Sequence, residues 1–394
     1  MKKTIFVCST AKFPDGDAGS IYYCNLVKCM TNDLDCILMI GAGNTDYSQV
    51  IKDKKTGLDI LSLRKHSNYI SRVISHFTIK RKIIDFIFKH CADIELLLMD
   101  GTFSLRNYKR VSRFFKKHNP NAKIVIGILE RYQKEEFDNR LLMSNMIRNN
   151  NNFIDKFNEK KCYIVCISSY LEELFVKRGF RCLRVPFIFD ATQSVSCEEK
   201  CNNLINDGKV RFIYAGAPSK KDLIVDIING LSLLPDSYLN KIEIYLIGVT
   251  ENWLFKHGLN KTVLIKLSNC LKVLGRLPHT DVEKYYMISD YSLLARDENK
   301  CFAKAGFPTK ISESLFYCIV PITNLTSDLH LYLEDGVNSV IIKGHSPENI
   351  SLAVMNAVDC YSNIKKMRIS VNEVLNQELS IQKFSSKVKE FLKL

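Results

Sequence analysis

One short stretch in the C-terminal part of the sequence combines a helix start, a cation and a carboxylate. In KAGFPTKISESLF, Pro308 and Thr309 precede an apolar helical stripe, and Lys310 and Glu313 lie beside it. Proline suits a first helical turn, where backbone N–H groups have no intrahelical partner and attract anions. Glu313 falls on a different helix face from the apolar residues. The stretch predicts a site for a phosphate and a hydroxylated ring, with solvated helix charges as the alternative.

Two lysines follow the apolar run VRFIYAG in a similar setting. Gly216 ends the predicted strand, Ser219 is the predicted N-cap, and Lys220 and Lys221 open the predicted helix. Lysine in a first helical turn opposes the helix dipole, unless an anion such as a diphosphate lies there. We therefore expect a phosphate site here, with a solvated lysine pair as the alternative.

Two arginines follow later strands of the same half. Arg276 lies in the loop after LKVLG, close to His279, which is more often a structural or surface histidine than a ligand. Arg296 follows YSLLA at a predicted carboxyl end, where a buried cation needs an anionic partner. Arg296 and Lys310 are therefore predicted to contact a substrate anion.

The N-terminal half offers fewer chemical groups. Gly16 and Gly19 lie in the loop after the first strand, where glycine lets a ligand approach a helix start, although the spacing is not that of a dinucleotide-binding loop. Asp17 in this loop, or Glu130 at the end of KIVIGILE, could orient or deprotonate a substrate hydroxyl. A purely structural carboxylate at Glu130 is the alternative.

Metal ions and cofactors are not predicted. The DLD triplet, Asp33 to Asp35, precedes a predicted strand instead of ending one, so we interpret it as a surface turn. The 14 cysteines are irregularly spaced and lie mostly in apolar runs, where a thiol behaves as a small hydrophobe. This usage favours a reducing cytoplasm over a disulfide or zinc framework.

Apolar runs and helical patterns alternate along the whole chain and must position these residues. This pattern predicts α/β architecture with two open parallel sheets that face each other across a cleft, with ligands beyond the carboxyl ends of the strands. We expect an N-terminal domain over 1–195 and a C-terminal domain over 205–375, with a helix at about 376–394 packing back on the first. The predicted strands of the second domain are VRFIYAG, KIEIYLIG, VLIKL, LKVLGR, YSLLAR, IVPITN and SVIIKG.

The net charge of +14 requires an anionic partner or substrate. No zinc-finger spacing or aromatic RNA-binding signature is present, so nucleic acid ranks last. The segment from Asn68 to His90 interleaves isoleucine and phenylalanine with cations, which suits an anionic membrane surface; a basic helix packed on its sheet is the alternative. No apolar run reaches the length of a spanning helix. We expect a cytoplasmic protein that binds the inner membrane face peripherally. The cations of this segment are Arg72, Lys80, Arg81, Lys82 and Lys89.

The second half resembles the donor-binding half of the retaining glycosyltransferases with the GT-B fold, in the large group called family four. The similar pieces, in order, are YAGAPSKKD, VLGRLPHTDVEKYYMISDYSLLAR and AGFPTKISESLFYCIVPITNLTSDLHLYLEDGVNSVII. FPDGDAGSIY, ILERY and CISSYLEELFVKRGF are similar to the acceptor-side half. The resemblance implies two facing Rossmann-like domains and a nucleoside-diphosphate-sugar donor. It also implies that Glu313 holds the ribose hydroxyls and that Lys220 or Lys221 holds the diphosphate.

The sequence departs from that group at two positions. The earlier glutamate of the paired-glutamate motif is Ala305 here, although the following Gly306 and Phe307 match. The arginine that commonly follows the diphosphate-loop glycine is Ala217, so a second cation must come from Arg296 or Lys310. These departures affect the identity of the donor sugar more than the type of reaction.

The resemblance implies transfer of a sugar to an acceptor hydroxyl with retention of configuration and without a metal. The expected acceptor is a lipid-linked or surface-polysaccharide intermediate. Two alternatives stay open: a sugar-nucleotide epimerase of the same fold, and a non-catalytic nucleotide-sugar binding protein, which Ala305 favours.

Overall fold

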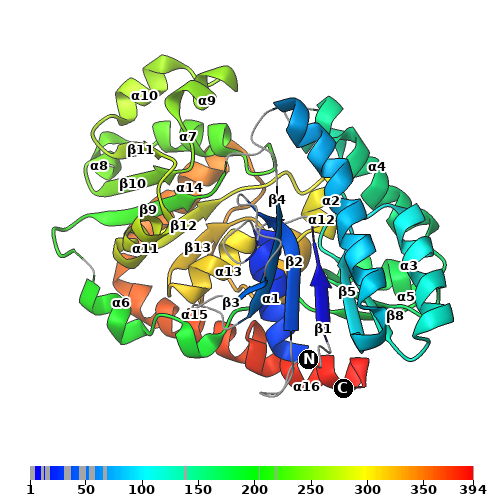
Figure 1. Ribbon diagram of the computed structural model, residues 1–394. Coiled ribbons are helices and arrows are strands. Elements are labelled where there is room, and N and C mark those ends of the chain that lie inside the picture. Colours follow the sequence, from blue (N-terminus) through cyan, green and yellow to red (C-terminus); the bar gives the residue numbers. More distant parts are fainter. Residues whose placement is uncertain are drawn as a thin grey trace. The chain divides into compact units, whose positions relative to one another are not determined.

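The computed structural model describes residues 5–9, 13, 18–30, 37–43, 50–52, 58–64, 69–136, 140–203, 205–217 and 220–393. The chain divides into two compact units. Unit 1 comprises Met1–Lys134, Asn139–Ile188 and Phe384–Leu394, and unit 2 comprises Glu135–Asp138 and Phe189–Lys383. Figure 1 labels the helices and strands of both units.

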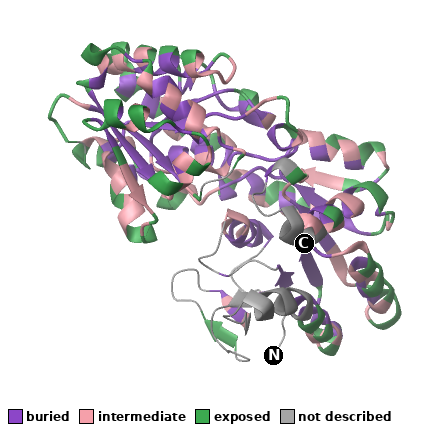
Figure 2. Ribbon diagram, turned by 90° about the horizontal axis from the view of Figure 1, so that it is seen from above, coloured by how far each residue is buried: buried purple, intermediate pink, exposed green. Residues whose placement is uncertain are grey.

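Unit 1 is built on an eight-stranded sheet of order β3-β4-β2-β1-β5-β6-β7-β8. All neighbouring strands pair in parallel except β3, which is antiparallel to β4 and was not predicted. The central strands are buried along their length, as continuous apolar runs in a parallel sheet require (Figure 2). The strands are β1 (Ile5–Cys8), β2 (Ile37–Gly43), β3 (Val50–Lys52), β4 (Asp59–Arg64), β5 (Leu96–Asp100), β6 (Lys123–Ile128), β7 (Tyr163–Cys166) and β8 (Arg181–Arg184).

The helices of unit 1 begin where sequence signals allow it. Ser104 and Ser168 cap α3 and α5 by accepting hydrogen bonds from the backbone N–H groups of Asn107 and Leu171. The helices are α1 (Ala18–Met30), α2 (Tyr69–Lys89), α3 (Leu105–His118), α4 (Arg140–Lys156) and α5 (Ser169–Lys177), with short 3₁₀ turns η1 (Cys91–Asp93) and η2 (Lys134–Glu136). Most of α16 (Ile381–Leu392) also belongs to this unit.

Unit 2 carries a six-stranded, fully parallel sheet of order β11-β10-β9-β12-β13-β14. Its strands are β9 (Val210–Ala215), β10 (Ile242–Ile247), β11 (Leu271–Gly275), β12 (Tyr291–Leu294), β13 (Val320–Thr323) and β14 (Val340–Ile341). Its helices are α6 (Cys197–Asn203), α7 (Ile224–Ser232), α8 (Asp236–Leu239), α9 (Glu251–Lys256), α10 (Lys261–Leu267), α11 (His279–Ile288), α12 (Cys301–Ala305), α13 (Thr309–Phe316), α14 (Pro347–Asp359) and α15 (Ile364–Glu378), with 3₁₀ turns η3 (Ala191–Gln193), η4 (Ser327–Leu331) and η5 (Tyr361–Asn363).

These two α/β units with predominantly parallel sheets confirm the predicted fold class. Two local predictions are wrong. The segment VLIKL is not a strand but part of α10, because Asn260 caps a helix there by accepting from the backbone N–H of Thr262. Helix α7 begins at Ile224, so Lys220 and Lys221 lie in a turn before it and not in its first turn.

The order of the strands in unit 2 reverses between β9 and β12. From β9 the chain moves outward through β10 and β11, whereas β12, β13 and β14 extend the sheet on the other side. Such a topological switch point leaves a crevice beyond the carboxyl ends of the two central strands. In the described part of the chain, no helix is both long and apolar enough to cross a membrane.

Candidate functional site

Four of the predicted donor-side residues gather beyond the carboxyl ends of β9 and β12. Gly216 follows β9, and Arg296 follows β12 after one residue. Lys310 and Glu313 come from α13, the second of the two helices between β12 and β13. The structure therefore brings these four residues to the switch point of the unit 2 sheet.

The centre of this site is a carboxylate that the sequence analysis missed. Asp222 has a side chain that is only 1% exposed, and its two oxygens lie 2.9 Å from Arg296 Nε and 2.7 Å from Lys310 Nζ. Tyr214 donates a third hydrogen bond, 3.0 Å long, to Asp222. Burial disfavours the charged carboxylate, but Lys310 and Arg296 outweigh it and hold the pKa of Asp222 well below its usual range. We call these four side chains the Asp222 cluster.

Backbone contacts fix the arginine of this cluster. Asp222 and Arg296 form an isolated antiparallel bridge, and the N–H of Leu223 donates to the carbonyl of Ala295. Asn324 accepts from the N–H of Arg296 at 3.0 Å and donates to its carbonyl oxygen at 2.6 Å. Arg296 thus has the anionic partner that its position required, and this partner belongs to the protein itself.

Two glycines make room for the lysine of the cluster. A Cβ atom on Gly216 would overlap the end of the Lys310 side chain, whose ammonium also lies 5.2 Å from the ring centre of Tyr214. Gly248 has φ +89°, and a Cβ atom there would overlap the carbonyl of Gly216. Gly248 therefore lets the loop after β10 approach the loop after β9, which carries the site.

Glu313 follows Lys310 by three residues on α13. Tyr286 of α11 donates a 3.2 Å hydrogen bond to the Glu313 carboxylate, and the Tyr286 ring stacks on Tyr317 with centroids 4.6 Å apart. Loss of hydration raises the pKa of Glu313, which Lys310 and Tyr286 oppose only in part. Glu313 is therefore a fixed acceptor beside a cation, a geometry that suits hydroxyl groups of a ligand.

The two lysines of the β9–α7 turn have different surroundings. Lys220 is exposed, whereas Lys221 forms an ion pair of 2.9 Å with Glu136 and lies 5.6 Å from the centre of the Phe302 ring. Ser219 lies outside the described residues. The turn places both lysines immediately before Asp222, so they are near the cluster in sequence without opening a helix.

The junction of α12 and α13 is largely buried. Ala305 is fully buried on α12, so the position of the missing glutamate lies in the core. Gly306 and Pro308 are also buried, and Phe307 packs edge-on against Tyr332. Thr309 begins α13, and no side chain caps this helix start. The backbone N–H groups of the first turn are therefore not satisfied by a capping side chain.

The remaining predicted residues either lie apart from the Asp222 cluster or are not among the residues that the structure describes. Arg276 follows β11 and is exposed, and His279 forms an ion pair of 3.2 Å with Glu283 on the surface of α11. In unit 1, Gly19 is the second residue of α1, and Glu130 is half-buried after β6. Gly16, Asp17 and the triplet from Asp33 to Asp35 lie outside the described residues.

Unit 1 has a switch point of its own, between β1 and β5. Asp100 at the end of β5 accepts a hydrogen bond of 2.8 Å from the Ser9 hydroxyl and one of 2.7 Å from the N–H of Thr102. Sequence analysis missed Asp100. Lys80 also lies here: it is 7% exposed and donates to the carbonyl of Thr102 at 2.8 Å. The prediction that Lys80 lies on an exposed basic face is therefore wrong.

One group of described side chains has the composition of a metal site. Ligand atoms of Asp297, Glu298 and His345 lie within 4.8 Å of one another. Hydrogen bonds account for this arrangement, since Glu298 lies 2.7 Å from His345 Nδ1 and accepts from Asn324 at 3.2 Å. Asn324 also links this group to the backbone of Arg296.

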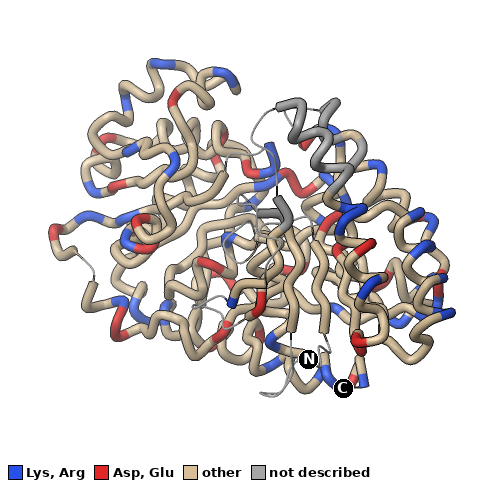
Figure 3. The backbone as a smooth tube through the Cα atoms, viewed as in Figure 1, with Lys and Arg blue, Asp and Glu red and all other residues tan. Residues whose placement is uncertain are grey.

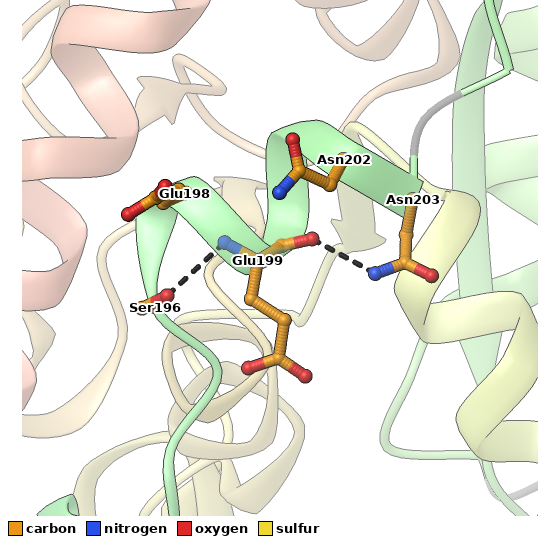
Figure 4. A pocket seen from close by; sticks show the side chains of 5 residues that line it. All are labelled: Ser196, Glu198, Glu199, Asn202 and Asn203. Atoms are coloured by element: carbon orange, nitrogen blue, oxygen red, sulfur yellow. Dashed lines mark hydrogen bonds between the residues drawn. The ribbon is translucent and has the colours of Figure 1, made fainter.

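A shallow pocket of about 380 Å³ lies on α6 and contains none of the residues of the Asp222 cluster (Figure 4). Ser196 accepts from the N–H of Glu199 there, and Asn203 donates to the Glu199 carbonyl. These hydrogen bonds are local helix contacts. The residues that line the pocket are serine, glutamate and asparagine, so it offers no cation. It is poorly suited to a phosphorylated ligand.

Solved structures resemble the whole chain. Sucrose-phosphate synthase from Thermosynechococcus elongatus superimposes with a TM-score of 0.71 at 11% identity, covering 99% of this chain and 98% of that one. Anabaena HepE in complex with UDP and glucose gives 0.70 at 12% identity over 100% of both chains. The lipopolysaccharide outer core galactosyltransferase WaaB gives 0.60 at 14% identity, also over 100% of both. No family model matches the chain, and the sequence search finds no curated relative.

Proposed function

The chain has the GT-B fold, and from this premise we propose that it is a glycosyltransferase. It transfers a sugar from a nucleoside-diphosphate sugar to an acceptor hydroxyl with retention of configuration. The observation that carries the proposal is the convergence of Lys310, Arg296 and Glu313 at the switch point of the unit 2 sheet. HepE, which has the same fold, is seen with UDP and with UDP-glucose, which supports a nucleotide-sugar donor.

The proposed roles follow from charge. As the glycosidic bond to the diphosphate breaks, negative charge grows on the leaving phosphate and positive charge on the sugar ring. Lys310, Arg296 and the uncapped N–H groups at the start of α13 stabilise the phosphate more in the transition state than in the ground state. Glu313 accepts hydrogen bonds from ribose hydroxyls. Lys220 or Lys221 adds a further cation from the turn that precedes α7. Gly216 and Gly306 have no side chain, so they let the donor approach the backbone.

Donor turnover tests this proposal directly. Wild-type protein incubated with UDP-glucose and other sugar nucleotides should release the nucleoside diphosphate slowly, and Glu313→Ala should reduce that rate at least tenfold without unfolding the chain. Asp281→Asn on the surface of α11 is the control. If no sugar nucleotide is hydrolysed but one raises the melting temperature, the chain is a non-catalytic binding protein. Interconversion of sugar epimers without transfer would identify an epimerase.

We also propose that the reaction needs no metal, because protein cations can meet the charge of the diphosphate. Addition of EDTA should change the rate of donor hydrolysis less than twofold. Complete loss, restored by magnesium or manganese, would contradict the proposal and direct attention to Asp297, Glu298 and His345.

The acceptor side rests on unit 1. We propose a lipid-linked or surface-polysaccharide intermediate as acceptor, with Glu130 or Asp17 orienting its hydroxyl, and peripheral attachment to the inner face of the membrane. Helix α3 supports this attachment more strongly than α2, because its 14 residues include no Asp or Glu (Figure 3). Its exposed cations are Arg106, Lys109, Arg110, Arg113, Lys116 and Lys117.

A further inference from the structure

The Asp222 cluster raises a question that the proposed function does not answer. A site for a diphosphate should offer free cations, yet Arg296 and Lys310 both contact one buried carboxylate. The carboxylate oxygens are divided between them, and Tyr214 donates to the oxygen that Lys310 contacts. Asp222 is therefore either an internal competitor for the donor or the residue that holds its two cations in place.

The geometry favours the second role. Asp222 lies beneath the cations: its side chain is 1% exposed, whereas those of Arg296 and Lys310 are 10% and 18% exposed. Each cation therefore keeps an outward part that an incoming anion can reach while Asp222 stays bonded to the inner part. A carboxylate that competed with the donor would instead occupy the accessible side of the cations.

Charge leads to the same conclusion. Without Asp222, two positive groups would lie close together at a crowded strand end, repelling one another with little water to screen them. Lysine is a flexible point charge with three rotatable donors, so Lys310 in particular needs a fixed partner to keep one direction. Asp222 leaves the pair with a net charge of +1, enough to attract a diphosphate.

We infer that Asp222 is a positioning residue that holds Lys310 and Arg296 side by side for the diphosphate of the donor. This inference rests on the proposed function, because it assumes that a nucleoside diphosphate binds at the switch point. Asp222 acts through the two cations and does not itself touch the substrate.

A double-mutant cycle on ligand affinity tests the inference. The affinity for UDP is measured by calorimetry for wild type, Asp222→Asn, Lys310→Met and the double variant, with uridine as a ligand that lacks phosphate. Asp222→Asn should weaken UDP binding about tenfold and leave uridine binding unchanged. The loss of UDP affinity from Lys310→Met to the double variant should be no more than about threefold, clearly smaller than the loss from wild type to Asp222→Asn, because Asp222 then holds only Arg296 in place. Asp281→Asn, an exposed change of the same type, should bind UDP like wild type.

Each outcome decides between the roles. Unchanged or tighter UDP binding by Asp222→Asn would overturn the inference and identify the carboxylate as a competitor of the donor. Fully additive losses in the double variant would overturn the inference, because Asp222 would then act without holding Lys310 beside Arg296. If Asp222→Asn does not fold, the charge-balanced double variant is compared with Lys310→Met, and a further tenfold loss overturns the inference. Wild type that binds neither UDP nor pyrophosphate would overturn the proposed function as well, which separates the two failures.

Discussion

Some side chains in unit 2 lower the stability of the fold while they serve ligand binding, and Glu313 is the clearest example. Its carboxyl has a raised pKa, so the folded state binds its proton more tightly than the unfolded state does. The penalty on folding is therefore absent below the ordinary pKa of about 4.3, grows as the pH rises above it, and is complete above the raised pKa. A carboxyl group whose burial opposes its charged form is typical of a binding site.

Glu313→Gln should therefore stabilise the protein while it weakens ligand binding. At pH 8 we expect the melting temperature to rise by roughly 2–4 °C, and at about pH 3 to stay unchanged, because the carboxyl group is then neutral in both states. UDP affinity at pH 8 should fall at least tenfold. Glu373→Gln, at an exposed position of α15, is the matched control. A lower melting temperature at pH 8 would contradict the assignment of the pKa shift.

Lys200 is a second buried charge, and it lies outside the proposed site. Its side chain is fully buried on α6 and donates to the carbonyl of Tyr286, the residue that bonds Glu313. Burial, with Arg368 nearby, lowers the pKa of Lys200 to about 7, and Asp290, Cys318 and Cys201 oppose this shift only in part. The unfolded state binds the proton more tightly, so stability should rise as the pH increases from about 7 towards 10.

Lys200→Met should remove this pH dependence. We expect the variant to be more stable than wild type at pH 6, by about 1–4 kcal/mol, as for other buried charges replaced by apolar groups of similar size. At pH 10 the two proteins should differ little. Urea unfolding at both pH values measures the effect, and equal or lower stability at pH 6 would show that the ammonium is well compensated by Asp290.

Sequence reasoning at the residue scale predicted Arg296, Lys310 and Glu313 and missed Asp222. The strand end before Arg296 and the helix start that carries Lys310 and Glu313 are local signals, which is why these three were found. Asp222 follows two lysines in a turn and carries no periodic or capping signal. The requirement that Arg296 have an anionic partner was the available clue, but only the pairing of β9 with β12 identifies which carboxylate it is.

At the scale of elements, the loops after β9 and β10 depend on one close approach. Gly248→Ala should cost more than the ordinary penalty of about 1–2 kcal/mol for a left-handed residue, because the new Cβ atom would overlap the Gly216 carbonyl. Since Gly216 adjoins Lys310, UDP affinity should also fall. Melting curves and UDP titration measure both effects.

Gly258→Ala provides the matched control. Gly258 has φ +95° but no atom within 4 Å of the added Cβ, so it should lose stability from backbone strain alone and keep wild-type UDP affinity. If the two variants lose equal stability and equal UDP affinity, the close approach of the loops after β9 and β10 does not contribute to UDP binding.

The element errors of the sequence analysis have local causes. VLIKL has the β-branched composition of a strand, but the Asn260 cap starts a helix before it. The predicted start of α7 was early because the cluster takes Asp222 out of the helix and bonds it to Arg296. Tertiary contacts decided both boundaries, and propensity does not report such contacts.

At the scale of the whole molecule, alternation of apolar runs and helical patterns was sufficient to predict two open α/β units. The net charge of +14 was also visible, but not its distribution: Lys80 is buried, whereas α3 exposes most of its cations. Exposure depends on which helix face packs on the sheet, and helical periodicity in α2 did not distinguish Lys80 from its neighbours.

Replacing Arg106, Lys109 and Arg113 by glutamine should weaken binding to anionic liposomes at least tenfold, since each cation contributes about 1 kcal/mol near the surface. Sedimentation at low salt measures this, and donor hydrolysis should be unaffected because the donor residues lie in the other unit. Glutamine at Lys256, Lys261 and Lys365 gives the same net charge change and should bind liposomes like wild type. If both triple variants lose binding equally, total charge and not α3 drives adsorption.

The path of the chain through the two units has a consequence for synthesis on the ribosome. Phe384–Leu394 follows all of unit 2 yet belongs to unit 1, where Phe391 packs edge-on against Tyr163 and the carbonyl of Lys393 accepts from Lys123 at 2.6 Å. Unit 2 can fold as soon as Lys383 has left the exit tunnel. Strands β6 and β7 of unit 1 stay partly uncovered until Phe384–Leu394, which is synthesised after unit 2, has emerged. The first half of this chain is therefore the last to be completed, and nascent unit 1 is the stage most exposed to aggregation and chaperone binding.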